Sequence, residues 1–362
     1  MRTVKQLLLA GLIKPEEKSL IEEVEKQFAL SITPQVIDLI HSDITDNTDN
    51  NSLDDPILKQ FLPSSEELNI KARELIDPIG DNLNSPVKGI VHQYPDRCLL
   101  MPVMVCPVYC RFCFRREQVA KTKGLSKAEL DNAYRYIQEH KEIWEVILTG
   151  GDPLILKPKV LSEILKSLVA IPHVEVIRIH TRVPAVQSDK ITDEMLNVLK
   201  TEKPLYVLLH SNHPNEFTPI VKETCARIVD KGIPMLSQTV LLKGINDNEE
   251  TLGELMRTFV KNRIKPFYLH HPDLAKGTSH FRVSIAKGQK LMRYLRGRFS
   301  GLCQPTYVLS IPGGYGKAPI QDSYIHSVSS MSTASLGKCE ESYECYDIED
   351  YNGVTHRYEG EL

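Results

Sequence analysis

The sequence predicts an α/β protein, a partial (β/α)6 TIM-type barrel with an N-terminal helical extension and a C-terminal extension. Two observations predict this fold. From about residue 99, short apolar runs alternate with longer amphipathic segments, which is typical of βα units repeated around a parallel sheet. Cysteines, glycines and histidines in unusual arrangements follow these runs, at the carboxyl ends of the expected strands, where barrel enzymes place their chemistry.

The composition is that of an ordinary globular protein. The chain has 362 residues, 41% of them hydrophobic, which is enough for the core of one large domain with extensions. Lys and Arg number 44 against 47 Asp and Glu, and the formal charge of -3 predicts neither a nucleic-acid nor a membrane partner. A local basic patch of Arg111, Arg115 and Arg116 remains open.

Residues 1–87 are expected to form an N-terminal helical region. The apolar run at 7–13 lacks a convincing cleavage site and continues into a helical pattern, so we expect a buried helix and not a signal peptide. Pro15 and the pair Thr33-Pro34 are typical of helix starts. The acidic, Asn-rich stretch at 42–55 predicts a surface loop or a disordered insert.

The barrel is expected at residues 88–290 and a C-terminal region at 291–362. The expected strands are 99–105, 146–149, 176–180, 206–210, 236–242 and 266–270. The expected helices are 127–140, 160–169, 193–199, 219–231 and 249–261. The residues at or after the carboxyl ends of the strands are, in order, the cysteines at 106–113, the turn at 150–152, Thr181-Arg182, His210 and the segment 270–273, and Gln238 sits late in the fifth strand.

Cys106, Cys110 and Cys113 have the spacing C-x3-C-x2-C on a loop. Thiolates are the ligands of iron–sulfur clusters, and three ligands where a cubane takes four leave one iron open for chemistry. We therefore predict an iron–sulfur cluster with an open iron. A structural zinc site completed by Cys98 or a distant histidine is an alternative, but Cys98 lies at the far end of the expected strand. Three buried free thiols would not need this spacing.

The use of cysteine also indicates a compartment. Eight cysteines are too few for a disulfide scaffold in a chain of this length, and three of them fall within eight positions. This pattern favours metal binding in a reducing environment, so we expect a cytoplasmic location.

With the cysteine loop in place, the sequence resembles the radical S-adenosylmethionine superfamily, whose C-x3-C-x2-C loop binds a [4Fe-4S] cluster. The resemblance implies that S-adenosyl-L-methionine binds the open iron and that its reductive cleavage gives a 5′-deoxyadenosyl radical. Gly150, Gly151 and Asp152 resemble the superfamily's turn that contacts the methionyl amine. The same three residues also suit an ordinary turn.

A second informative segment is the glycine-rich run at 313–319, which contains Lys317. It is not a phosphate-binding P-loop, because Ile311 and Ala318 stand where that motif needs Gly and Ser or Thr. A lysine on a glycine-rich turn is suited to form a Schiff base, because little side-chain bulk crowds a planar cofactor. An exposed loop lysine is the alternative.

Several ordered motifs together resemble the lysine 2,3-aminomutase family, over a match that runs from about Lys88 to Ile320. They are residues 94–97, 106–116, 179–184, 210–216 and 313–319. The resemblance implies an isomerase that moves an amino group between C2 and C3 of an amino acid. It also implies that Lys317 carries pyridoxal 5′-phosphate and that a reductant such as flavodoxin or ferredoxin supplies electrons.

The resemblance further implies roles in substrate binding. Arg115 matches the arginine that pairs with the substrate carboxylate, a task that suits a guanidinium fork. Asp273 matches one of two aspartates that hold the distant ammonium of lysine. The second aspartate is replaced by Ser310, which weakens recognition of that ammonium by roughly 1.5–3 kcal/mol. Conversion of L-lysine to L-β-lysine is the first expectation, and the same reaction on another amino acid is the alternative.

Other matched positions carry cofactor roles by the same resemblance. His210 and Gln238 match positions beside S-adenosylmethionine, and Arg97 matches a residue near the cofactor phosphate. Cys339 and Cys345 depart from the family's zinc-binding tail, so no zinc site is expected from them and any homo-oligomer built on that tail is open. A non-catalytic iron–sulfur protein is the remote alternative.

Overall fold

The structure is a computed structural model that describes residues 1–46, 55–122, 124–332 and 342–361. Within these residues the main sheet has nine strands in the order β1 to β9. β1 is antiparallel to β2, the strands from β2 to β8 are parallel, and β9 returns antiparallel to β8. The strands are β1 Ile90–Tyr94, β2 Arg97–Val103, β3 Glu145–Gly150, β4 Val176–Thr181, β5 Leu205–His210, β6 Met235–Val240, β7 Ile264–His270, β8 Thr306–Ser310 and β9 Lys317–Pro319.

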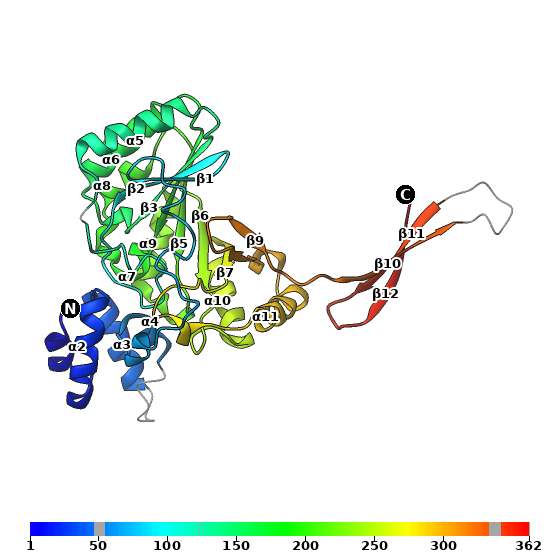
Figure 1. Cartoon of the computed structure of the whole chain (residues 1–362), viewed down its shortest axis with the longest axis horizontal. Helices are drawn as coiled ribbons and strands as arrows, with labels where there is room; N and C mark the ends of the chain where they lie inside the picture. The colour runs from blue at the N-terminus through cyan, green and yellow to red at the C-terminus, as the bar shows by residue number, and fades with distance from the viewer. Residues whose placement is uncertain (47–54, 123, 333–341, 362) are drawn as a thin grey trace.

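Helices connect the parallel strands and cover the outer side of the curved sheet (Figure 1). They are α5 Lys127–Glu139, α6 Pro158–Val169, α7 Val183–Val186, α8 Asp193–Leu199, α9 Pro219–Asp230, α10 Glu249–Lys261 and α11 Ile285–Arg298. Central strand side chains such as Leu148, Ile179 and Val207 are fully buried and share one core with helix residues such as Leu161 and Ile228. The predicted α/β partial barrel is confirmed, with β2 to β7 at the six expected strands and β8 as a further parallel strand.

The N-terminal region is helical, as expected, with α1 Val4–Leu9, α2 Lys18–Gln27, α3 Pro34–Asp46 and α4 Pro56–Phe61. Leu7 is buried in α1, whereas Leu9 is 79% exposed. The stretch expected to be a loop from residue 42 begins as helix, because Ile44 continues the helical spacing of Ile37 and Ile40 and α3 runs to Asp46. Residues 47–54 of that stretch lie outside the described residues.

The open side of the sheet is bridged by the glycine-rich turn and by the segment at 77–84 that precedes β1. The Tyr94 hydroxyl, on β1, accepts a hydrogen bond from the backbone N–H of Lys317, on β9, at 2.7 Å. Gly80 and Gly314 pack backbone to backbone, since a Cβ on Gly80 would lie 2.5 Å from the Gly314 Cα. Both have positive φ, of 72° and 82°, which favours glycine. The turn therefore closes the sheet at Lys317.

The end of the chain forms a separate three-stranded antiparallel sheet, here called the arm, with β10 Ile325–Ser332, β11 Ser342–Glu349 and β12 Thr355–Glu361. Figure 1 shows it projecting from the body. Its base is fixed to α11, because Arg293 donates to Asp322 at 2.7 Å and also pairs with Glu349. A Cβ on Gly297 of α11 would lie 2.1 Å from the Cβ of Tyr351. Cys345 is buried in the arm, and Cys339 lies outside the described residues.

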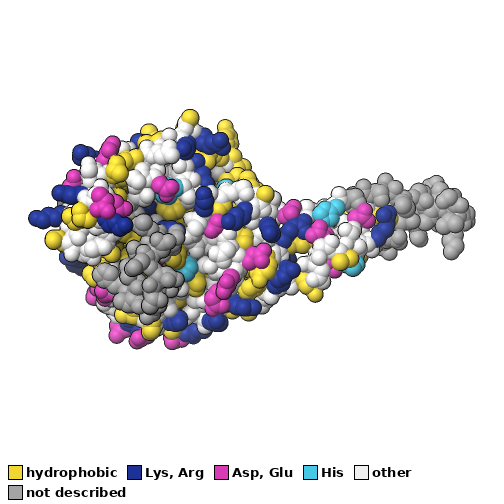
Figure 2. Space-filling model, turned by 90° about the horizontal axis from the view of Figure 1, so that it is seen from below, with side chains coloured by type: hydrophobic (Ala, Val, Ile, Leu, Met, Phe, Trp, Pro, Cys, Tyr) yellow, Lys and Arg dark blue, Asp and Glu magenta, His cyan; other side chains and the backbone are white. Residues whose placement is uncertain are grey.

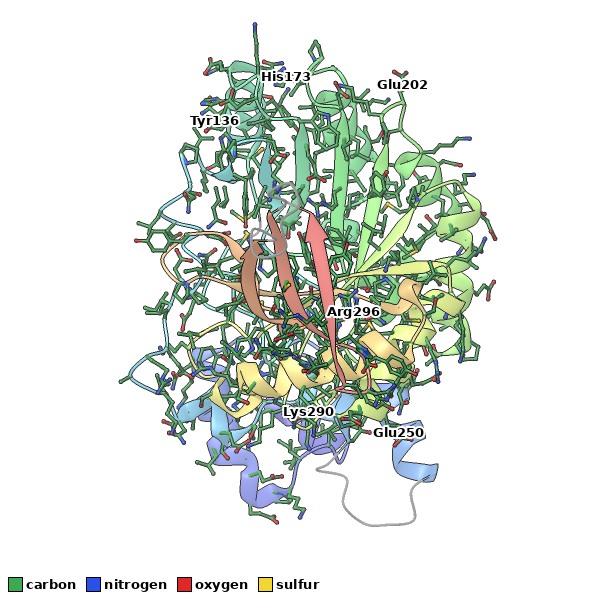
Figure 3. The ribbon with its side chains drawn as sticks, turned by 90° about the vertical axis from the view of Figure 1, so that its right-hand side faces the viewer. Tyr136, His173, Glu202, Glu250, Lys290 and Arg296 are labelled. Carbon is green, nitrogen blue, oxygen red and sulfur yellow. The ribbon has the colours of Figure 1, made fainter. Side chains whose placement is uncertain are left out.

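The figures also show how charge and the elements are distributed. On the face in Figure 2, acidic and basic side chains are interspersed over the body. In Figure 3, Tyr136 on α5 lies near the top of the body, and Arg296 and Lys290 on α11 lie lower down. Among the described helices, none is both long enough and apolar enough to cross a membrane. The domain boundaries at residues 87 and 290 stay predictions.

Candidate active site

The cysteine loop follows β2, and the N-terminal region holds it in place. The backbone N–H of Tyr109 donates to the carbonyl of Ser31 at 3.0 Å, and the Ser31 hydroxyl donates to the carbonyl of Pro107 at 2.8 Å. The backbone N–H of Arg111 donates to the carbonyl of Gln60, on α4, at 2.9 Å. The helical extension is therefore part of the site and not an independent attachment.

The arginines of the loop are buried, so the possible exposed basic patch is not formed. Glu67 accepts from the Arg111 Nε at 2.9 Å and also pairs with Arg116. Arg111, Arg115 and Arg116 are 2%, 8% and 6% exposed, and Glu67 is fully buried. Burial opposes ionisation of Glu67, but Arg111 and Arg116 outweigh it and lower its pKa. These arginines shape the loop and do not offer charge to solvent.

The three thiols of the loop lie close to one another. Burial, the Asp152 charge and the other two thiols raise the pKa of Cys106 well above its ordinary value. Burial and Cys110 raise the pKa of Cys113 to about 11. In the described part of the chain, no three His, Cys, Asp or Glu side chains already surround a single-ion position. A four-iron cluster spaces its ligands more widely than a single ion does, so three neighbouring thiols on one loop fit it.

A positively charged side chain contacts these thiols. The Arg182 guanidinium, directly after β4, donates from one terminal nitrogen to Cys110 Sγ at 2.8 Å. Because thiolate ligands and sulfides make a cluster site electron-rich, a buried guanidinium against one sulfur suits it.

The glycine turn after β3 packs on the stretch that leads into the cysteine loop. The N–H of Gly151 donates to the carbonyl of Val103 at 2.7 Å, and a Cβ on Gly151 would lie 2.3 Å from the carbonyl oxygen of Val105. Gly150 has a φ of 99°, a value that residues with a Cβ atom rarely adopt. Both glycines are therefore needed to bring the turn against the loop.

The buried Asp152 carboxylate accepts several hydrogen bonds from protein groups. It accepts from the Thr181 hydroxyl and the Arg182 N–H, both at 2.7 Å, and from the Leu154 N–H at 3.1 Å. Burial raises the pKa of Asp152, against the effect of these hydrogen bonds. Asp152 thus ties the turn after β3 to the end of β4, and contact of this turn with S-adenosylmethionine stays a prediction.

His210 and Gln238 are brought together, as partners in the register between β5 and β6. The His210 ring lies 5.6 Å from the ring of Phe112, which sits between the second and third cysteines. Burial and the Arg182 charge keep the pKa of His210 well below its ordinary value. His210 Nε2 and the hydroxyl of Ser211 are buried without a hydrogen-bond partner. Such unpaired atoms beside the cysteine loop fit a polar ligand such as S-adenosylmethionine.

Lys317 lies on the edge strand β9, and several charged residues act on it. Lys317 is exposed to solvent. Desolvation by the surrounding protein nevertheless lowers the pKa of its amine, the charge of Arg115 lowers it further, and the Asp273 carboxylate raises it. The charges of Asp81 and Arg97 act on it too. A lowered pKa favours the neutral amine, the form that condenses with an aldehyde, and a nearby arginine suits a phosphate. Lys317 and Arg97 thus fit pyridoxal 5′-phosphate.

Arg97 and Arg115 already have protein partners. Arg97 donates to the neighbouring Asp96 at 2.6 Å and lies 3.8 Å from the centre of the Tyr94 ring. Arg115 Nε donates to Asp81 at 2.7 Å, and both side chains are buried. A substrate carboxylate at Arg115 would therefore share the guanidinium with Asp81.

Asp273, on the loop after β7, accepts a hydrogen bond from Ser310. Burial raises the pKa of Asp273 to about 6, and the charges of Lys317 and Arg115 act against this rise. The two positions that were expected to face the far end of the substrate therefore contact each other beside Lys317.

Three further polar residues lie near Lys317, and none of them was assigned a role from the sequence, although the two histidines lie in segments noted there. Burial lowers the pKa of His270 to about 3 and that of His180 well below its ordinary value, with Lys317 adding to both effects. The Nε2 atom of His180 is buried without a partner. Both histidines stand at strand ends, which was an available signal, whereas Asp81 lies in a turn-rich stretch and had none.

A curved parallel sheet, a three-thiol loop after its first parallel strand and a glycine turn after the next define a radical S-adenosylmethionine enzyme. Residues 101–256 match the Radical SAM superfamily.

Comparison with characterised proteins gives the family. L-lysine 2,3-aminomutase of Clostridium subterminale is 38% identical over 330 residues, which are 91% of this chain and 77% of that protein. The Methanococcus maripaludis enzyme is 42% identical over 86% of this chain and 71% of its own length. Glutamate 2,3-aminomutase of Clostridioides difficile is 38% identical over 86% and 72%. The chain belongs to the lysine 2,3-aminomutase family, isomerases that use a [4Fe-4S] cluster, S-adenosylmethionine and pyridoxal 5′-phosphate.

Proposed function

We propose that this chain moves an amino group between C2 and C3 of an amino acid, with L-lysine as the first candidate substrate. The observation that carries the proposal is the position of Arg115. It lies two residues after Cys113, on the cysteine loop, and its charge also acts on Lys317 and Asp273. This supports a shared site for the cysteine loop and Lys317, which a reaction that uses both cofactors would require.

The proposal assigns the residues as follows. Cys106, Cys110 and Cys113 hold the cluster, and the turn at 150–152 with His210 and Gln238 holds S-adenosylmethionine. When bound, these groups supply a carbon radical, and the pyridoxal ring supplies the π system through which an amino group migrates.

The remaining assignments concern the substrate and the second cofactor. Lys317 holds the pyridoxal group and Arg97 its phosphate. Arg115 orients the substrate carboxylate, and Asp273 faces the far end of the side chain.

The substrate side chain is proposed to be cationic or neutral. Asp273 is a carboxylate that would repel an acidic side chain, while Ser310 offers a hydroxyl where a second charge was expected. One carboxylate and one hydroxyl still suit an ammonium group, more weakly than two carboxylates would. A different amino acid with a neutral hydrogen-bonding side chain is therefore the second candidate, and Ser310 is the observation that favours it.

We also propose the setting in which the enzyme works. A one-electron reductant such as flavodoxin or ferredoxin is the proposed partner, because the cluster must be reduced before the radical forms. The described cysteines are free thiols, which supports a reducing cytoplasmic location. A homo-oligomer is a further proposal, since β10 and β12 are edge strands of the projecting arm.

Anaerobic reconstitution with iron, sulfide and pyridoxal 5′-phosphate tests the assignments. The wild-type chain should bind iron and show the visible absorbance of bound pyridoxal. Lys317→Ala should lose that absorbance and keep the iron, whereas Lys88→Ala, which removes an exposed lysine paired with Glu129, should keep both.

A panel of amino acids with S-adenosylmethionine and reductant then identifies the substrate by its β-amino acid product. A chain that binds iron but neither pyridoxal nor S-adenosylmethionine would support a non-catalytic iron–sulfur protein instead.

A further inference from the structure

Arg182 is buried at the end of β4 and reaches three parts of the molecule. One terminal nitrogen donates to Cys110 Sγ at 2.8 Å. The other donates to Gln60 Oε1 at 2.6 Å and to Glu216 Oε2 at 3.0 Å. Its own backbone N–H is held by Asp152 at 2.7 Å. The side chain is 5% exposed, so water does not compete for these bonds.

The acceptors that surround the guanidinium are themselves fixed. Glu216 Oε1 accepts from the backbone N–H groups of Asn212 at 2.8 Å and His213 at 3.0 Å. It also accepts from Gln60 Nε2 at 3.3 Å. The Oε2 atom is thus left for Arg182. The guanidinium therefore has little freedom to turn away from Cys110.

Aromatic rings hold the guanidinium from two sides. Its central carbon lies 4.5 Å from the centre of the Phe61 ring and 5.6 Å from that of Phe112. Phe61 belongs to the N-terminal region and Phe112 to the cysteine loop, so both elements fix the position of Arg182.

We propose that Arg182 is a positioning residue that donates an N–H···S hydrogen bond to Cys110 and raises the reduction potential of the cluster that this thiolate holds. The inference rests on the proposed function for one point, that Cys110 is a cluster ligand. Hydrogen bonds to the sulfurs of a cluster are among the factors that set its potential. A donor and positive charge favour the state that carries one more electron, so they ease the one-electron reduction from the 2+ to the 1+ state.

The Glu216 carboxylate acts in the opposite direction. It offsets part of the Arg182 charge, from the side of the guanidinium that does not face the sulfur. Removal of that negative charge leaves the hydrogen bond in place and the guanidinium uncompensated. Variants at the two positions are therefore expected to shift the potential with opposite signs, which a general loss of packing would not do.

The test is a redox titration of the full-length, anaerobically reconstituted chain, followed by electron paramagnetic resonance of the reduced cluster, without S-adenosylmethionine. In Arg182→Gln the ratio of reduced to oxidised cluster at a fixed potential should fall about tenfold, which equals about 59 mV for a one-electron couple. Arg182→Lys, which keeps the charge, should fall between this variant and the wild type. Glu216→Gln should shift the ratio upward.

Arg178→Gln is the matched control. Arg178 is a buried arginine within β4, four residues before Arg182, and it pairs with Glu145 at 2.6 Å. This variant should titrate like the wild type. Iron and sulfide contents are measured for every variant, so that only fully loaded samples are compared.

The outcomes separate this inference from the proposed function. A wild-type chain that takes up no cluster contradicts the proposed function. A loaded Arg182→Gln variant with the wild-type potential overturns the role of Arg182. If Arg182→Gln does not retain its cluster, Glu216→Gln decides, and the absence of an upward shift there overturns the inference as well.

Discussion

Ser310 and Lys317 are cross-strand partners in the antiparallel ladder between β8 and β9. The Ser310 hydroxyl also donates to Asp273, whose carboxyl group is in turn affected by the Lys317 charge. One short ladder therefore presents both the lysine and the residue that departs from the family's substrate site. If Asp273 holds the substrate side chain as proposed, a change at Ser310 should alter substrate recognition.

Ser310→Asp is expected to strengthen lysine binding about tenfold. A second carboxylate adds a charge-assisted hydrogen bond worth roughly 1.5–3 kcal/mol, and about 1.4 kcal/mol corresponds to a factor of ten. Part of this gain is offset because the new carboxylate repels Asp273. The measurement is the dissociation constant of lysine at pH 8. Ser310→Asn, of similar size and without charge, is the control, and an equal gain in that variant would contradict the explanation.

The affinity for a cationic amino acid is expected to fall as the pH drops through about 6. Burial raises the pKa of Asp273 to about that value. The carboxyl group is neutral below its pKa and charged above it, so only the upper range attracts an ammonium. Binding of lysine is measured between pH 5 and pH 8 for the wild type and Asp273→Asn. The variant should bind weakly with a flat profile over this range, and a wild-type profile that is equally flat would refute the role of Asp273.

Gly151→Ala is expected to reduce the iron content of the reconstituted protein severalfold. Its Cβ would lie 2.3 Å from the Val105 carbonyl oxygen, a backbone atom that cannot move without displacing the cysteine loop. Gly301→Ala is the control, because no atom lies within 4 Å of the added Cβ. Iron and sulfide are determined per chain after identical reconstitution. Equal contents in the two variants would mean that the turn does not position the loop.

Glu67→Gln is expected to destabilise the protein by about 3–5 kcal/mol, the usual cost of removing one partner from a buried ion pair. Arg111 and Arg116 would lose the carboxylate that both contact. Urea denaturation of the cluster-free protein measures the effect. The exposed neighbour Glu66 supplies the control, and a Glu66→Gln variant should stay close to the wild type. A similar stability of the two variants would show that the buried pair contributes little.

Much of the barrel could be predicted from the sequence because its signals are local. Each parallel strand from β2 to β7 is a short apolar run between turns, and Pro34 begins α3 as expected. β8, Thr306 to Ser310, was not among the expected strands. A loop was expected from residue 42 because of its acidic composition, but α3 continues to Asp46, and Ile44 extends its helical apolar spacing.

The site was predictable where residues are close in sequence and unpredictable where they are distant. The spacing of the cysteines is local, and so is the glycine-rich turn around Lys317. The contact of Ser31 with Pro107 spans 76 positions, and that of Arg182 with Cys110 spans 72. Nothing in the arginines of the loop signals that a single buried glutamate at position 67 pairs with two of them.

The N-terminal helices supply the backbone partners of the cysteine loop, at Ser31 and Gln60. Protein synthesis runs from the N-terminus, so the ribosome releases these partners before the thiols that they support. The segments that support the cysteine loop are thus synthesised before the cysteines themselves. If the loop holds the cluster as proposed, a chain without its first sixty-odd residues would keep every cysteine and still take up iron poorly, because the missing segment supports the loop without ligating iron.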